Sequence, residues 1–224
     1  MPTRRRVLVA AGAAGLGGCL GGGGSGAPPD GPVANAPIPE TPGAHRYATA
    51  GTGSAPVVTY VGSWKCPYCA EFSLGFLRDI VEEYVEPGAL SLRYRALAYA
   101  SDGGPFLGPD APRAARAGLA VWNVDPDTYW RFHEHVMANQ PPEGRRWATT
   151  DRLVGFAEEA GVEGTDRIRA AVEGGRYRAA VRATARMTFE AGVEGTPALL
   201  IDGEVVSPFE KERTRRLLDR VAGA

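Results

Sequence analysis

The feature that most constrains this chain is a pair of cysteines, Cys66 and Cys69, placed where a strand is expected to pass into a helix. Residues 57–61 before the pair are mostly β-branched or aromatic, which favours a strand. Residues 69–85 after it carry apolar side chains at steps of three or four, the period of an amphipathic helix. Residues 90–97 then alternate between apolar and polar, as in a second strand. A crossover helix of this length between two strands predicts a parallel β-α-β unit.

The first cysteine stands at the expected N-terminus of that helix. Unpaired backbone N–H groups and the positive end of the helix dipole gather there, and both stabilise a thiolate. We therefore expect a lowered pKa for the Cys66 thiol, attack by Cys66 on a disulfide, and resolution of the mixed disulfide by Cys69. The two cysteines are also close enough in sequence to bridge each other. Pro67 and Tyr68, which lie between them, are expected to set the geometry and the thiolate pKa.

Other uses of a Cys-x-x-Cys pair fit this sequence less well. Half of a zinc site would need two more ligands at suitable spacing, and the chain offers only Cys19, His45, His133 and His135. The last two are two residues apart on an expected helix, so they point to different sides; we expect solvated or partly buried roles for them. A purely structural bridge over so short a loop would add little stability. We expect no metal and no organic cofactor.

Residues 1–18 have the pattern of an export signal. The arginines at positions 4–6 resemble a twin-arginine signal, and the Ala/Gly-rich apolar stretch that follows is too short to span a bilayer. Leu16-Gly17-Gly18-Cys19 resembles the lipobox of prokaryotic lipoproteins, in which the cysteine thiol receives a diacylglyceryl group. We expect a protein attached by lipid at Cys19 to the outer face of the cytoplasmic membrane; the alternative is an ordinary signal peptide with a chance cysteine. In both cases the protein reaches a compartment where disulfides persist.

The next segment, residues 19–45, is expected to be a flexible tether because glycine and proline dominate it and it contains no aromatic residue. Residues 46–224 are then the folded domain, long enough for a single core. Residues 19–224, which comprise the tether and the domain, contain 22 of the 25 basic residues and all 26 acidic residues. Their formal charge is therefore −4. Such a balance does not indicate nucleic-acid binding.

Within the domain, residues 101–192 are expected to be mainly helical, and β-structure returns after them. Asp202-Gly203 predicts a hairpin between an apolar run and Val205-Val206. Further elements are expected at residues 47–50 (a short strand), 111–121, 127–138, from 150 or 151 onward, 168–172, 177–189 and 210–221 (helices).

The sequence Gly195-Thr196-Pro197 stands directly before the apolar run 198–201. Together with Cys-Pro-Tyr-Cys after a strand, it resembles the thioredoxin superfamily. The long helical stretch between the two motifs is similar to the DsbA branch, where a helical insertion interrupts the thioredoxin fold. The resemblance covers about residues 46–224 and implies an α/β fold whose mixed sheet is flanked by helices. It also implies that Pro197 is cis and faces the cysteines, and that Thr196 tunes them and pairs its backbone with a bound peptide.

The resemblance further implies an extracytoplasmic thiol:disulfide oxidoreductase that uses Cys66 and Cys69. Its partners would be cysteine-containing exported proteins and a membrane or soluble redox partner. We interpret the chain as a DsbA-like oxidant. A reductase or isomerase of the same fold, a non-catalytic surface binding module and, more distantly, a metal chaperone are the alternatives.

Two features depart from the DsbA pattern, and two neighbouring residues have open roles. The strand 57–62 lacks the acidic residue often found in that branch, and Pro-Tyr is also the glutaredoxin dipeptide. Trp64 looks like the aromatic residue that precedes the motif in thioredoxins, either as a part of the site or as a rim residue. For Lys65 we expect a solvated charge rather than a role beside Cys66.

Overall fold

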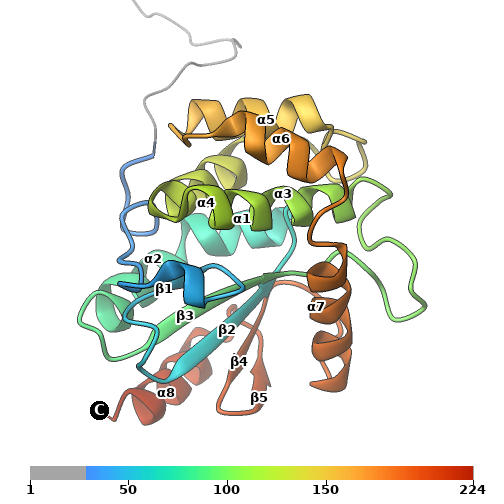
Figure 1. Cartoon of the computed structure of the whole chain (residues 1–224). Coiled ribbons are helices and arrows are strands. Elements are labelled where there is room, and N and C mark those ends of the chain that lie inside the picture. Colours follow the sequence, from blue (N-terminus) through green and yellow to red (C-terminus); the bar gives the residue numbers. More distant parts are fainter. Residues whose placement is uncertain (1–28, 224) are drawn as a thin grey trace, which may run out of the picture.

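The computed structural model describes residues 29–223, whose centre is a five-stranded sheet of order β1-β3-β2-β4-β5 (Figure 1). Strands β2 and β3 are parallel, with Val57 opposite Ser91 and Gly62 opposite Ala96, and every other pair is antiparallel. The mixed sheet and the predicted parallel β-α-β unit are therefore confirmed. The strands are β1 (Thr49–Ala50), β2 (Val57–Gly62), β3 (Ser91–Ala96), β4 (Ala198–Ile201) and β5 (Glu204–Val206).

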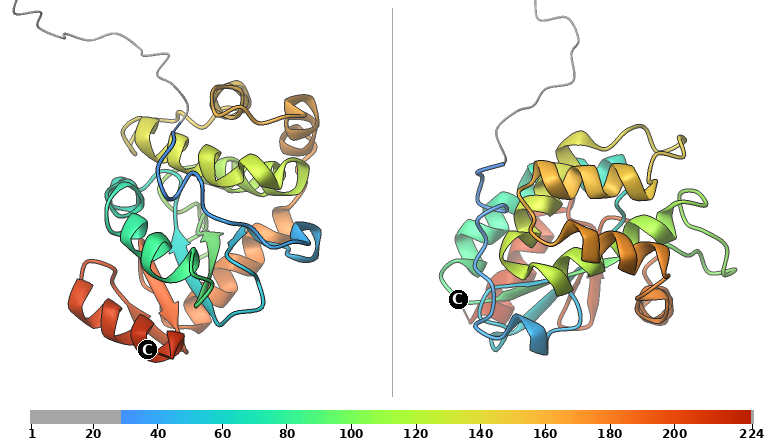
Figure 2. Two further views of the ribbon diagram at one scale, coloured as in Figure 1. Left: turned by 90° about the vertical axis from the view of Figure 1, so that its left-hand side faces the viewer. Right: turned by 45° about the horizontal axis from the view of Figure 1, so that its top comes forward.

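Helices cover both faces of the sheet and form an additional layer at one end of it. In the left-hand view of Figure 2, α2 and α8 lie on one face and α7 on the other. The insertion helices α3 to α6 are stacked above α1 in Figure 1. The helices are α1 (Pro67–Leu74), α2 (Phe76–Ile80), α3 (Ala111–Val124), α4 (Tyr129–Asn139), α5 (Thr150–Glu159), α6 (Thr165–Glu173), α7 (Arg178–Glu190) and α8 (Lys211–Ala222), with short helical turns at Pro42–Ala44, Val81–Val85 and Pro126–Thr128.

The helix expected over residues 69–85 is interrupted at Gly75. This glycine has φ −115° and ψ −108°, outside the helical region, and the chain resumes as α2. A π-helical turn at Val81–Val85 ends the segment. The apolar period continues across the break, with Phe72, Phe76 and Leu77 all buried, so the pattern alone does not reveal it.

Within the expected tether 19–45, the described residues 29–45 are packed against the domain. Val33 and Ala36 are buried in the main core, and the Ala34 N–H donates to the Glu134 carboxylate at 2.9 Å. The Gly51 N–H also donates to the Pro37 carbonyl at 2.7 Å. The segment is packed because its few small apolar side chains find partners on the domain, which composition does not reveal. The expected signal 1–18 and Cys19 lie outside the described residues. Among residues 29–223, no helix has both the length and the apolar character needed to cross a bilayer.

The close approach of Gly118 on α3 to Trp64 is expected to be sensitive to one added methyl group. A Cβ at position 118 would lie 2.6 Å from a ring carbon of Trp64, which is buried and cannot move aside. We expect Gly118→Ala to lower the free energy of unfolding by about 1–3 kcal/mol in urea titrations. The control is Gly155→Ala on α5, where nothing lies within 4 Å of the new methyl group. That change should raise stability by about 0.4–1 kcal/mol, and a neutral Gly118→Ala would contradict the prediction.

Candidate active site

The two cysteines occupy the junction between β2 and α1. Pro67 is the first residue of α1 and Cys66 directly precedes it as the N-cap, while Cys69 lies within the first turn. Pro67 fits this position because the N–H that it lacks would have no partner in the helix. Both cysteines are free thiols in the structure, Cys66 4% exposed and Cys69 fully buried. The Cys66–Cys69 disulfide stays a prediction.

The environments of the two sulfurs push their pKa values apart. The pKa of Cys66 is lowered to about 6, chiefly by a hydrogen bond from Cys69, which outweighs the opposite effect of burial. Hydrogen bonds from Thr196 and from the N–H groups of Cys69 and Tyr68 lower this pKa further. Burial, followed by the neighbouring Cys66, raises the pKa of Cys69 well above its usual value. The Ser63 N–H donates to Cys69 Sγ at 3.3 Å and lowers the pKa of Cys69, but by less than burial raises it. At neutral pH this arrangement holds one thiolate, on Cys66, and one thiol, on Cys69.

The loop before β4 faces these sulfurs. The Thr196–Pro197 peptide is cis, as the resemblance implies. In its protonated form, the Cys66 thiol donates a hydrogen bond to the Thr196 carbonyl at 3.4 Å. The buried Thr196 hydroxyl has no oxygen or nitrogen partner among the described residues, and it helps to lower the pKa of Cys66.

A groove of about 480 Å³ runs beside the cysteines along this loop. Tyr68 and Phe209 form part of its wall, and they are the two large hydrophobic side chains that stand out as exposed, at 61% and 45%. Their rings meet edge to face at 6.4 Å between centroids. The rest of the lining comes from residues 192–198 and 205–207. The groove offers apolar side chains beside the backbone of residues 192–198, a combination suited to an extended peptide.

Trp64 is not a rim residue. It is 3% exposed and packs against Tyr94, Phe132 and His133, with ring centroids 5.2–5.4 Å apart. The side chain therefore supports the motif from behind and does not line the groove.

The expectation that Lys65 is a solvated charge is wrong. The residue is 1% exposed, and its ammonium lies 2.5 Å from Asp110 Oδ1 and 3.0 Å from the Arg145 carbonyl. The other Asp110 oxygen accepts the Ala148 N–H at 2.9 Å. Burial would raise the pKa of Asp110, but the bonds from Lys65 and Ala148 outweigh it and the pKa is lowered. These contacts tie the residue before Cys66 to α3 and to the loop before α5.

Two further polar side chains that the sequence did not single out reach the motif. The Gln140 amide donates to the Cys66 carbonyl at 3.3 Å, and the Tyr60 hydroxyl lies 3.4 Å from the Cys69 carbonyl. Gln140 directly follows α4, so the insertion contacts the motif at this point. A glutamine in a loop carries no sequence signal for such a contact.

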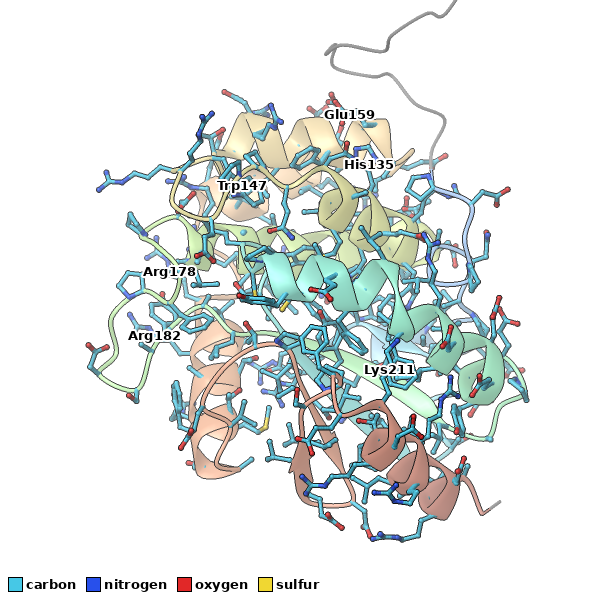
Figure 3. The ribbon with its side chains drawn as sticks, turned by 180° about the vertical axis from the view of Figure 1, so that it is seen from behind. His135, Trp147, Glu159, Arg178, Arg182 and Lys211 are labelled. Carbon is cyan, nitrogen blue, oxygen red and sulfur yellow. The ribbon has the colours of Figure 1, made fainter. Side chains whose placement is uncertain are left out.

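The two histidines of α4 point to different sides, as expected, but His133 is fully buried rather than solvated or partly buried. Its Nε2 lies 3.1 Å from Ser73 Oγ, and burial lowers its pKa to about 3, so the ring is neutral. The other histidine, His135, pairs with Glu159 at 2.8 Å on the outer side of the insertion, where both are labelled in Figure 3. No group of three potential metal ligands occurs within residues 29–223.

Comparisons with known proteins place this arrangement among relatives. Residues 45–220 match the family described as thioredoxin. A probable disulfide bond formation protein D of Bacillus cereus is 26% identical over 160 residues, which cover 70% of this chain and 71% of the relative. The oxidised structure of BdbD from Bacillus subtilis superposes with a TM-score of 0.71 at 21% identity, covering 85% of this chain and 99% of that one. DsbA from Chlamydia trachomatis gives 0.65 at 20% identity, covering 78% and 92%. These two structures share the fold of this chain.

Proposed function

Because the chain belongs to the thioredoxin family, we propose that it is an extracytoplasmic thiol:disulfide oxidoreductase of the DsbA type, which transfers its own Cys66–Cys69 disulfide to exported proteins. The observation that carries the proposal is the unequal pair of sulfurs at the start of α1, beside the Thr196 carbonyl and an open peptide groove. The relatives named as disulfide bond formation proteins support the same class of reaction.

The exchange has two steps. A substrate thiolate attacks Cys66 Sγ of the oxidised protein, forming a mixed disulfide while Cys69 leaves and takes up a proton. A second substrate thiolate then attacks the substrate sulfur of the mixed disulfide, and Cys66 leaves as a thiolate. The substrate is thereby oxidised by two electrons and the protein reduced by two. Cys66 is a good leaving group because its pKa is low, and Cys69 is held ready to resolve the mixed disulfide in the reverse direction.

The electrostatics favour oxidation of substrates over their reduction. Whatever stabilises the Cys66 thiolate stabilises the reduced protein, and this makes the disulfide a stronger oxidant. The reduction potential of the Cys66–Cys69 pair distinguishes this oxidant from the alternative, a reductase or isomerase of the same fold. A reduction potential of about −120 mV indicates an oxidant, and one of about −270 mV indicates a reductant.

Attachment to the membrane is a separate part of the proposal. The lipobox-like sequence that ends in Cys19 supports a lipid anchor after export, with the domain on the outer face of the cytoplasmic membrane. Its partners there are cysteine-containing proteins and a redox partner that reoxidises the Cys66–Cys69 pair.

The test of the proposed chemistry is the pH dependence of Cys66 alkylation in the reduced protein. The rate of reaction with iodoacetamide should be half-maximal near pH 6, where Cys66 titrates, and not near the value of about 8.5 of an ordinary thiol. Cys69→Ala removes the hydrogen bond that lowers the pKa most, so its midpoint should rise. A midpoint above pH 8 in the parent protein would instead indicate a binding module whose cysteines form a fixed bridge.

A further inference from the structure

Three buried polar side chains form a continuous row that ends at Cys69, the resolving cysteine. The Tyr60 hydroxyl on β2 lies 3.4 Å from the Cys69 carbonyl and 3.2 Å from Ser73 Oγ on α1. Ser73 Oγ lies 3.1 Å from Nε2 of His133 on α4. All three side chains are fully buried, so bulk water does not compete for these hydrogen bonds. Tyr60, Ser73 and His133 together are the polar row.

Packing holds the Tyr60 ring in place. Its centroid lies 4.9 Å from that of Phe72 on α1 and 5.0 Å from that of Tyr94 on β3, edge to face in both cases. In the sheet, Tyr60 is paired with Tyr94 on one side and with Leu199 of β4 on the other. A buried ring enclosed in this way has no room to turn aside, so its hydroxyl stays next to Cys69.

The groups at the two ends of the polar row set the direction of its hydrogen bonds. The Cys69 carbonyl can only accept, so the Tyr60 hydroxyl donates toward Cys69 and accepts from Ser73. Ser73 then accepts from Nε2–H of His133, whose ring is neutral because burial lowers its pKa to about 3. Nδ1 of His133 has no partner in the described part of the chain, which fits a nitrogen without a proton, since unpaired buried N–H groups are rarer than unpaired acceptors. Every hydrogen in the row therefore points toward Cys69.

Cys69 carries negative charge in both directions of disulfide exchange. It receives the electron pair of the broken S–S bond when a substrate attacks Cys66, and it attacks the mixed disulfide as a thiolate in the reverse reaction. Burial opposes this charge and, with the neighbouring Cys66, raises the pKa of Cys69 well above its usual value. The six residues of β2 include no acid that could exchange a proton with the sulfur. A hydroxyl that donates to the sulfur offsets part of the cost of the buried charge.

The Tyr60 hydroxyl is such a donor. Burial raises the pKa of Tyr60 well above its usual value, and the charge of Cys69 and a hydrogen bond to the Cys69 side chain raise it further. The hydroxyl therefore keeps its own proton and acts on the sulfur by hydrogen bonding, not by proton transfer. Burial and then the charge of Cys69 raise the pKa of Tyr94 too, but the Tyr94 hydroxyl has no hydrogen-bond partner among the described residues.

We propose that Tyr60 donates a hydrogen bond to the Cys69 sulfur whenever that sulfur carries negative charge. Ser73 and His133 are positioning residues that hold the Tyr60 hydroxyl in the donating direction. The inference rests on the proposed oxidoreductase function and assigns the group that serves the resolving cysteine. As a substrate thiolate attacks Cys66, the S–S electron pair passes to Cys69, and the proton that Cys69 then takes up comes from water. In the reverse reaction Cys69 loses that proton to water, and the same hydrogen bond stabilises the attacking thiolate.

The experiment records the attack by Cys66 and the attack by Cys69 in one reaction. Reduced full-length protein that carries Cys19→Ser is mixed with excess dithiobis-nitrobenzoate in a stopped-flow spectrometer. Cys66 attacks the reagent and releases one coloured nitrothiobenzoate, at a rate that depends on reagent concentration. Cys69 then attacks Cys66 Sγ and releases a second one, at a rate that does not. Tyr60→Phe should slow the second release at least about tenfold, because a hydrogen bond to a charged group is lost, and should leave the first within about twofold.

The matched control is Tyr94→Phe, which removes the hydroxyl of a neighbouring buried ring that makes no hydrogen bond within the described residues. Both releases should then stay within about twofold of the parent rates. Ser73→Ala leaves the Tyr60 hydroxyl free to turn and should slow the second release by about three- to fivefold. Nitrogen NMR of the parent protein should find the His133 proton on Nε2.

The first release reports the proposed function, and the second reports the role of Tyr60. A parent protein without a rapid first release would refute the oxidoreductase proposal and this one with it. A normal first release, together with a second release that Tyr60→Phe leaves unchanged, would refute the role of Tyr60 alone. Equal slowing in Tyr60→Phe and Tyr94→Phe, or equal slowing of both releases, would also refute it, since a loss of packing explains either result. A His133 proton on Nδ1 would reverse the row and contradict the positioning role of Ser73 and His133.

Discussion

Replacing Cys66 with serine should abolish disulfide exchange. The hydroxyl cannot form the mixed disulfide, and Cys69, which is fully buried and has a raised pKa, cannot take over as the attacking thiolate. We expect the rate of insulin reduction in the presence of dithiothreitol to fall at least about 10³-fold relative to the parent protein. Oxidation of a reduced, unfolded substrate should be lost to the same extent.

The companion variant Cys69→Ser separates attack from resolution. Cys66 keeps its place at the start of α1, so this variant should still react with substrate but accumulate as a mixed disulfide, visible on non-reducing gels. A Cys66→Ser protein with full insulin-reduction activity would refute the assignment of the nucleophile. If the Cys66→Ser variant instead formed a mixed disulfide with substrate through Cys69, then Cys69 would be the nucleophile and Cys66 the resolving cysteine.

The same variants bear on a pH effect in the reduced protein. The pKa of Cys66 in the folded state, about 6, lies below the value of about 8.5 for an unfolded thiol. The thiolate therefore adds stability that is fully present above about pH 8.5 and is lost as the pH falls through about 6. Cys66→Ser lacks this titration, so the reduced parent and the variant should differ most in alkaline solution.

The parts of this molecule that could be predicted from the sequence are those encoded locally. The Cys66–Cys69 pair follows a β-branched strand and opens a periodic helix, and both patterns lie within a few turns of chain. The Asp202-Gly203 hairpin is equally local, since the turn requires a positive φ at both positions and the structure has it there. With the sequence before Pro197, these elements were enough to predict the fold and to place both sides of the site.

The parts that could not be predicted depend on contacts between distant residues. Lys65 meets Asp110 across 45 positions, and Gln140 reaches Cys66 across 74. Neither partner belongs to a periodic pattern, so the sequence indicates only a charged residue and a loop. The same holds for Val33, whose burial depends on surfaces supplied by later elements. Such contacts are properties of the assembled tertiary structure and leave no mark on local composition.

Removing Asp110 should destabilise the protein more than any surface substitution. Asp110→Ala leaves the Lys65 ammonium buried with the Arg145 carbonyl as its remaining partner, and it leaves the Ala148 N–H without an acceptor. Breaking a buried ion pair in this way costs about 3–5 kcal/mol in the free energy of unfolding. Urea titration of the oxidised proteins measures this loss in the free energy of unfolding. The control is Asp151→Ala, which breaks an exposed ion pair with Arg169 and should cost no more than about 1 kcal/mol.

The double variant Lys65→Met/Asp110→Leu tests whether the loss comes from the unpaired charge. Both buried charges are then absent, so most of the stability should return although the ion pair does not. Acid should affect the parent protein and the double variant differently. The pKa of Asp110 is lowered in the folded parent, so its carboxylate contributes stability above about pH 4. That contribution is lost as the pH falls through the folded-state pKa. The double variant should lack that loss. If Asp110→Ala and Asp151→Ala cost the same, Lys65 is not held by this pair, and the connection between the cysteine motif and the insertion must depend on Gln140 instead.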